Sequence, residues 1–202
     1  MESHPRAVRG GLGAESSVTT SDLLDPSVRA RLEELGVSFE VMECDPSLAD
    51  TAAFVEAYGV ALQRSANTIG VASKGAESTY VACVLLATTS LDVNSVVRRE
   101  MGVRKASFAR ADPVRELTGM EIGGVTPFGL PAEVPILVDA RVMEPDWVIL
   151  GGGNRSSKLK LAPGALLELS SVRVVEGLAR AISSPDAGMP PSGRRVTVTR
   201  GQ

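Results

Sequence analysis

The spacing of apolar residues along the chain changes repeatedly between a helical period and a strand period. Residues 26–35 carry apolar side chains three or four positions apart after an Asp-Pro pair, and Gly36 follows, which predicts a helix that ends there. Residues 37–41 alternate apolar and polar side chains, which predicts a half-buried strand. By the same criteria we predict further helices at 51–58, 92–101, 163–169 and from residue 112 onward, and further strands at 68–72, 80–86, 105–109, 136–138, 147–150 and 172–175.

Two of these strands are expected to pair as an antiparallel hairpin. Residues 68–72 and 80–86 are rich in β-forming side chains, and the segment Ser73-Lys74-Gly75-Ala76 between them is typical of a turn. Hairpins of this kind, in place of strict alternation of strand and helix, favour an α/β chain of the α+β type. We therefore expect a mixed, largely antiparallel sheet or open barrel with surrounding helices.

The two ends of the chain lack this periodicity. Residues 1–20 mix glycine, serine, threonine and charged side chains, and residues 183–202 repeat proline, glycine and serine before a short basic end. Both segments are predicted to be flexible tails. Because 202 residues fit one domain comfortably and no internal repeat is visible, residues 21–182 are predicted to form a single folding unit.

Charge and cysteine content narrow the classes of function. The formal net charge of −3 argues against a dedicated DNA-binding protein, although transient contact with the end of a nucleic acid is compatible with it. Cys44 and Cys83 form no CxxC motif, and the only histidine, His4, lies in a predicted tail, so we expect no metal site and no cofactor. Both cysteines are expected to be buried as small apolar residues.

No part of the sequence is typical of a membrane protein. The longest apolar run, residues 80–88, is about half of the length that spans a bilayer. The N-terminus also lacks the apolar core of a signal peptide. We therefore expect a cytoplasmic protein without a membrane partner.

The first segment that indicates chemistry is Gly123-Gly124-Val125-Thr126-Pro127-Phe128-Gly129. Glycine permits close backbone approaches and proline stiffens the loop, so the segment can direct several N–H groups toward one point. Backbone donors held in that way can stabilise the oxyanion that develops during ester hydrolysis. The alternative is an ordinary structural turn, because glycine and proline are the commonest loop residues.

Two further candidates follow predicted strands. Asp139 comes after the strand 136–138 and either orients a substrate group or caps a turn. The sequence Gly151-Gly152-Gly153-Asn154 offers backbone amides after the strand 147–150. It is neither a Walker loop nor a dinucleotide-binding fingerprint, because it lacks a following GK[ST] and does not read GxGxxG.

In this order and spacing, the pieces resemble the YbaK/EbsC family, which includes free-standing aminoacyl-tRNA deacylases and the editing domain inserted in some prolyl-tRNA synthetases. The resemblance spans residues 32–177. It implies that the Gly-x-x-x-Pro loop lines the pocket around the aminoacyl ester. The site residues that it implies are Asn67, Gly124 and Asp139 as catalytic candidates, and Gly123, Val125, Thr126, Pro127, Gly129, Gly151, Gly152 and Asn154 as substrate-binding candidates.

One position departs from the family pattern. Family deacylases typically carry a lysine in a Val-x-Lys-[Thr/Ser]-Leu pattern, and here that position falls on Asn67, or on Ala66 if the register slips by one. A neutral amide can still form hydrogen bonds but supplies no charge. The other basic residues either approach the phosphates of a tRNA or, as is commoner, form part of a solvated face. They are Arg98, Arg99, Arg104, Lys105, Arg155, Lys158 and Lys160.

Two hypotheses follow. The first is a trans-editing hydrolase that deacylates mischarged aminoacyl-tRNA carrying a small amino acid, with the acceptor end of the tRNA as partner and an aminoacyl-tRNA synthetase as a further candidate partner. The sequence argues against a serine-hydrolase triad at Ser65 or Thr126, because the only histidine lies in a predicted tail. The second is a catalytically silent module that binds aminoacyl-tRNA, an amino acid or a protein partner.

Overall fold

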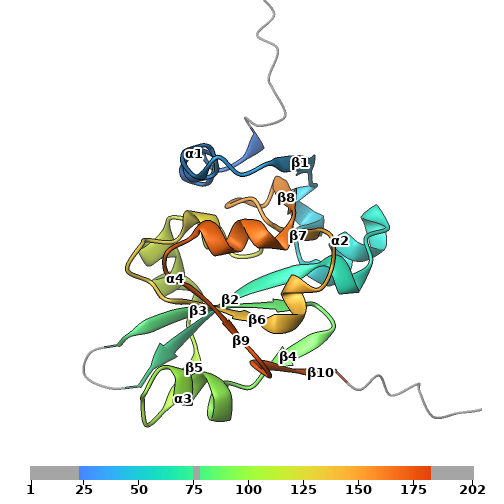
Figure 1. The fold of residues 1–202 in the computed structure, drawn as a ribbon. Helices are drawn as coiled ribbons and strands as arrows, with labels where there is room; N and C mark the ends of the chain where they lie inside the picture. Colours follow the sequence, from blue (N-terminus) through green and yellow to red (C-terminus); the bar gives the residue numbers. More distant parts are fainter. Residues whose placement is uncertain (1–22, 75–77, 183–202) are drawn as a thin grey trace, which may run out of the picture.

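The computed structural model describes residues 23–74 and 78–182 (Figure 1). Its helices are α1 (Pro26–Leu35), α2 (Thr51–Tyr58), α3 (Arg98–Glu100) and α4 (Ala111–Thr118), and its strands are β1 (Phe39–Glu43), β2 (Ala66–Ser73), β3 (Tyr80–Leu86), β4 (Thr89–Leu91), β5 (Ala106–Phe108), β6 (Ile136–Asp139), β7 (Val148–Gly151), β8 (Ser157–Leu161), β9 (Val172–Val175) and β10 (Ala179–Ala181). Single helical turns, among them η5 (Pro127–Gly129) and η7 (Pro163–Glu168), lie between them.

The central sheet is five-stranded and mixed, in the order β5-β2-β3-β6-β9. Its first three strands are antiparallel, and β3, β6 and β9 run parallel to one another. Strands β2 and β3 form the predicted hairpin, in which Asn67 lies opposite Leu85. The prediction of a mixed sheet with hairpins and surrounding helices is therefore confirmed.

A second sheet, β1-β8-β7, is antiparallel throughout. A parallel bridge between Ser65 and Ile149 joins it to the start of β2. Figure 1 shows α1 and this sheet at one end of the molecule and α3 at the other, with the five-stranded sheet between them. Strands β4 and β10 pair separately.

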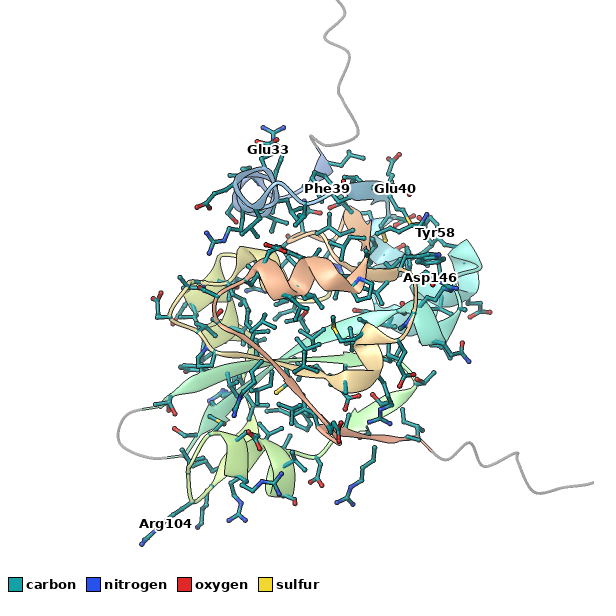
Figure 2. The ribbon with its side chains drawn as sticks, in the orientation of Figure 1. Glu33, Phe39, Glu40, Tyr58, Arg104 and Asp146 are labelled. Carbon is teal, nitrogen blue, oxygen red and sulfur yellow. The ribbon has the colours of Figure 1, made fainter. Side chains whose placement is uncertain are left out.

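The central sheet is covered on both faces, which explains why residues 80–86 are apolar without interruption. Val84 and Val138 face a cluster that includes Leu32 of α1. The alternate residues Cys83 and Leu137 face a second cluster on the opposite side. The interior between the layers is filled with side chains (Figure 2).

Both cysteines are buried and free, as predicted. Burial raises the pKa of the Cys83 thiol to about 12. Arg104, by contrast, is exposed and extends away from the fold beside α3 (Figure 2). It belongs to the solvated face, as the sequence indicated.

Several predicted elements are displaced or fall outside the described residues. The first strand begins at Phe39 instead of residue 37, and the helix predicted at 92–101 begins as one π-helical turn, η4 (Val93–Val97), before α3. The predicted tails, residues 1–20 and 183–202, lie outside the described residues. None of the described helices is long and apolar enough to cross a membrane.

Candidate functional site

A pocket of about 400 Å³ opens where the two sheets meet. Five segments that are distant in the sequence line it, together with one side chain from β8. The lining consists of Ala49, Asp50, Thr51, Phe54, Ser65, Ala66, Asn67, Thr68, Ile69, Gly70, Phe108, Ala109, Ala111, Val114, Ile122, Gly123, Val125, Ile149, Leu150, Gly151 and Lys158. Many of these residues are glycine or alanine, so the walls are built largely from backbone and short side chains.

Residues 123–129, which we call the glycine loop, form one wall of the pocket. Backbone hydrogen bonds connect this loop to the turn between β7 and β8. The Gly153 amide donates to the carbonyl oxygen of Gly124 at 2.7 Å, and the Glu121 amide donates to the carbonyl oxygen of Gly153 at 3.0 Å. A Cβ on Gly124 would lie 2.0 Å from the carbonyl oxygen of Asn154. Only a residue without a side chain allows these two backbones to approach so closely.

Gly123 has a φ of 92°, in the region that favours glycine. The backbone amides of residues 123–125 differ in whether they have an acceptor. The Gly124 amide donates to the carbonyl oxygen of Glu121 at 2.9 Å. Gly123 and Val125 both line the pocket, and their backbone amides have no acceptor among the residues that the structure describes. They are the backbone donors that this loop offers to a ligand.

Strand β2 brings Asn67 to the facing wall. Its side-chain carbonyl oxygen accepts a hydrogen bond of 2.6 Å from the hydroxyl of Thr51. Its amide nitrogen has no acceptor in the described part of the chain, so it can donate into the pocket. The neighbouring hydroxyl of Thr68 is buried and also has no partner among the described residues. Polar groups of this kind are expected to meet water or a ligand.

Lys158 enters the pocket from β8 and is only 6% exposed. Its Nζ donates to the carbonyl oxygen of Ala49 at 2.6 Å and to that of Gly123 at 2.9 Å. Burial lowers the pKa of Lys158 below its usual value, against the opposing effects of nearby Cys44 and Asp50. The interpretation of Lys158 as part of a solvated face was therefore wrong.

Arg155 makes a second connection between the same two walls. Its Nη1 donates to the carbonyl oxygen of Ile122 at 2.9 Å and pairs with Asp50 at 3.3 Å, and its Nε donates to the carbonyl oxygen of Pro46 at 2.9 Å. Together with Lys158, it holds the glycine loop against the segment that leads into α2. Lys160, in contrast, pairs with Glu40 near the surface, as expected of a solvated face.

Four of the predicted site residues line the pocket, namely Asn67, Gly123, Val125 and Gly151. Six others belong to the same loop or turn but do not line the pocket, namely Gly124, Thr126, Pro127, Gly129, Gly152 and Asn154. Asn154 is occupied by hydrogen bonds to Leu23, Ser156 and Ser157. Thr126 and Pro127 are the buried part of the glycine loop. Gly129 packs against Met120. The Gly152 amide donates to the carbonyl oxygen of Ser157.

Asp139 is not among the residues that line the pocket, and its carboxylate is engaged elsewhere. It is fully buried, pairs with Arg141 through contacts of 2.8 and 3.0 Å, and accepts from the Ala179 amide at 2.9 Å. Burial alone would raise the pKa of the Asp139 carboxyl, but these hydrogen bonds outweigh it and hold the pKa below its usual value. The carboxylate thus connects the end of β6 to β10.

The pocket also contains residues that the sequence did not single out. Asp50, Thr51 and Phe54 come from the start of α2, and Phe108 comes from the end of β5. No group of three or more histidine, cysteine, aspartate or glutamate residues in the described ranges could hold a metal ion. Among the lining residues, only Asp50 and Lys158 have ionisable side chains.

Known proteins are similar in sequence to the part of this chain that contains the pocket. A family model described as "Aminoacyl-tRNA editing domain" matches residues 45–169, which include every residue that lines the pocket. YwhH of Bacillus subtilis (strain 168), an uncharacterized protein, is 30% identical over 148 residues, which cover 73% of this chain and 92% of YwhH.

Two solved structures are similar over most of the described fold. One is a candidate trans-editing enzyme for prolyl tRNA synthetase, with a TM-score of 0.65 and 25% identity, covering 78% of this chain and 98% of that chain. The other is the hypothetical protein APE2540, with a TM-score of 0.68 and 25% identity, covering 76% of this chain and 99% of that chain. The likeness thus extends over nearly the whole of each relative.

Proposed function

Because the chain belongs to the aminoacyl-tRNA editing domain family, we propose that it is a trans-editing hydrolase that deacylates mischarged tRNA carrying a small amino acid. The observation that carries the proposal is the pocket itself. At Gly123 and Val125 it offers two backbone amides that have no acceptor in the described part of the chain, and it adds the side-chain amide of Asn67. Donors of this kind suit a carbonyl oxygen that becomes negatively charged during ester hydrolysis.

The reaction breaks the ester bond between the carbonyl carbon of the amino acid and the terminal ribose oxygen of the tRNA. Water adds to that carbon, and the electron pair of the C=O bond moves onto its oxygen. The tetrahedral species then collapses, the ribose oxygen leaves and takes up a proton, and the free amino acid is released. Asn67, or a hydroxyl of the substrate, positions the attacking water, because no lining residue is a histidine.

The size of the pocket supports a small amino acid. Its volume of about 400 Å³ lies toward the lower end of the range of roughly 300–1,000 Å³ that is usual for small-molecule sites. The pocket must hold the ester and part of the ribose as well as the side chain. Editing is also most useful for small apolar amino acids, because a synthesis site separates them poorly by binding alone.

Removing the side chain of Asn67 tests its polar contact. We expect Asn67→Ala to lower the rate of deacylation about fivefold, since one hydrogen bond of about 1 kcal/mol is lost. Single-turnover kinetics with saturating protein would measure this rate. Asn94→Ala changes an exposed asparagine outside the pocket and should leave the rate unchanged. An Asn67→Ala rate equal to that of the unaltered protein would remove Asn67 from the proposed site.

The mouth of the pocket offers a surface for the terminal adenosine. Phe108 is 58% exposed and Ile122 is 39% exposed, and both line the pocket. Stacking of a base on an aromatic ring contributes about 1–3 kcal/mol. We therefore expect Phe108→Ala to raise KM for aminoacyl-tRNA about tenfold with a small change in kcat.

Two variants make this measurement specific. Phe108→Trp keeps an aromatic ring and should keep KM near its original value. Leu167→Ala removes a side chain that is 55% exposed outside the pocket, and KM should not change. If Phe108→Ala and Leu167→Ala have the same KM, the stacking role is refuted.

The proposal as a whole is tested by the deacylation of a panel of tRNAs charged with amino acids of increasing size. Similarity to a candidate trans-editing enzyme for prolyl tRNA synthetase makes tRNA for proline the first tRNA to charge. We expect alanine and serine to be removed faster than phenylalanine. Equal rates for all amino acids would contradict the proposed specificity. Binding of charged tRNA without hydrolysis would favour a silent binding module.

A further inference from the structure

The position of Lys158 is unusual for a lysine. Its neighbours on β8, Leu159 and Leu161, are buried on the opposite face of the strand, where the core lies. Its own face is covered by the segment that begins α2, so that Nζ lies 5.4 Å from the centre of the Phe54 ring. The ammonium group is therefore enclosed at the wall of the pocket.

No carboxylate in the described part of the chain forms a direct ion pair with Lys158. Among the described residues, no carboxylate oxygen lies within 4.0 Å of Nζ, and its two hydrogen-bond acceptors are neutral backbone carbonyls. An ammonium has three N–H donors, so one donor remains without an acceptor in the described structure. A buried charge that lacks a paired charge is costly unless it has a functional role.

The two carbonyls fix Nζ beside the donors of the glycine loop. One acceptor is the carbonyl oxygen of Gly123, a residue that itself lines the pocket. The other acceptor, Ala49, immediately precedes Asp50 at the pocket rim. This arrangement fixes a positive charge against the carbonyl of Gly123, in the same loop whose amides at Gly123 and Val125 have no acceptor among the described residues. An oxygen that becomes negatively charged can bind there.

We propose that Lys158 is a catalytic residue of the hydrolysis proposed above, in which its ammonium group stabilises the negative charge on the ester carbonyl oxygen after water has added. This inference rests on the proposed function. Lys158 transfers no proton: it remains an ammonium while the C–O bond to water forms and the bond to the ribose oxygen breaks. The backbone amides and the ammonium then share one oxyanion.

Lys158→Met tests this role, because methionine has a similar length without charge. We expect kcat to fall about 100-fold, as is usual when one oxyanion donor is removed, with a smaller change in KM. Lys160→Met is the matched control on the same strand, and it should keep the original kcat because Lys160 pairs with Glu40 at the surface. Unchanged kcat in a folded Lys158→Met protein would overturn the inference.

A second measurement separates charge stabilisation from support of the fold. Lys158→Ala leaves a space beside the pocket that a small alkylammonium ion can enter. We expect ethylammonium to restore part of kcat in Lys158→Ala and to have no effect on Lys160→Met. A structural role alone would be indicated if ethylammonium restored the melting temperature of Lys158→Ala but not its kcat.

The pH profile gives a third readout that does not depend on any variant folding. The charged and titratable groups around Lys158 are Cys44, Arg155 and Asp50, and burial is the largest influence on the pKa of Lys158, which lies below its usual 10.5. If the ammonium is required, the enzymatic rate above background should fall as pH rises through this lowered pKa. A rate that stays level up to pH 10.5 would contradict the inference. Absence of hydrolysis in the unaltered protein would instead refute the proposed function itself.

Discussion

Gly124→Ala is expected to reduce deacylation more than about 100-fold, because displacement of a catalytic loop by about 1 Å can have an effect of that size. A Cβ at this position would lie 2.0 Å from the carbonyl oxygen and 2.5 Å from the carbonyl carbon of Asn154. These are backbone atoms, so no side chain can rotate away to relieve the overlap. The glycine loop must move away from the turn between β7 and β8, and the amides of Gly123 and Val125 move with it.

The same substitution should also destabilise the protein, by about 1–3 kcal/mol or more. Both quantities therefore need to be measured, the rate by single-turnover kinetics and the stability by urea unfolding. Gly164→Ala is the matched control, since a Cβ built there has no atom of a described residue within 4 Å, apart from Gly164 and its two chain neighbours. A Gly124→Ala protein with the original rate would show that the loop does not need this close approach.

The second large effect is expected from Asp139→Asn, on stability. The carboxylate is fully buried, and its removal leaves Arg141 without its ion-pair partner. Breaking a buried pair on one side costs about 3–5 kcal/mol, and because Arg141 is partly exposed we expect about 3 kcal/mol here. For a chain of this length, that corresponds to a melting temperature lower by roughly 6–12 °C.

The control for this measurement is Asp146→Asn. Asp146 lies 3.8 Å from Arg64 and its side chain is 92% exposed, so its stability effect should stay within about 0.5 kcal/mol. Because Asp139 is outside the pocket lining, the rate per folded molecule should change much less than in Gly124→Ala. A large loss of rate in folded Asp139→Asn protein would show that Asp139 does take part in catalysis.

Asp139 also predicts how stability depends on pH. Its pKa in the folded protein lies below the usual 3.8, so the unfolded chain binds the proton more tightly. The stabilisation that it provides is therefore complete above about pH 4–5 and is lost as pH falls through the folded pKa. Asp139→Asn should abolish this part of the acid dependence, which unfolding measured between pH 5 and pH 2 would show.

Local periodicity predicted most of the fold correctly. The hairpin of β2 and β3 was predictable because turn residues separate two uninterrupted β-rich runs. Strand β8 was not predicted, although its five residues alternate lysine and leucine. Strands β4 and β10 were not predicted either, because each has three residues, and three residues are too few to show an alternation. Their pairing depends on contacts that join residues 89–91 to residues 179–181, which no local pattern can reveal.

The site was predictable where backbone requirements determine the residue. The closely packed Gly124 and the positive φ of Gly123 leave a recognisable glycine motif. The sequence around Lys158 shows no comparable motif, because Lys158 and Lys160 alternate with leucines and so match an exposed strand face. Only the tertiary position of the segment before α2 buries one of the two lysines. Asp139 has the sequence context of a site residue, because it follows a buried strand. In the folded chain its carboxylate binds Arg141 and the amide of Ala179 instead.

The central claim is that this pocket hydrolyses aminoacyl-tRNA, and a single-turnover assay tests it most directly. Purified protein in excess is mixed with alanine-charged tRNA for proline at neutral pH, and the remaining ester is followed over time beside a sample without protein. We predict loss of the ester faster than the spontaneous rate, with a rate that saturates as protein concentration rises and that Gly124→Ala removes. Loss at the spontaneous rate at every protein concentration, for this and every other charged tRNA, would contradict the account.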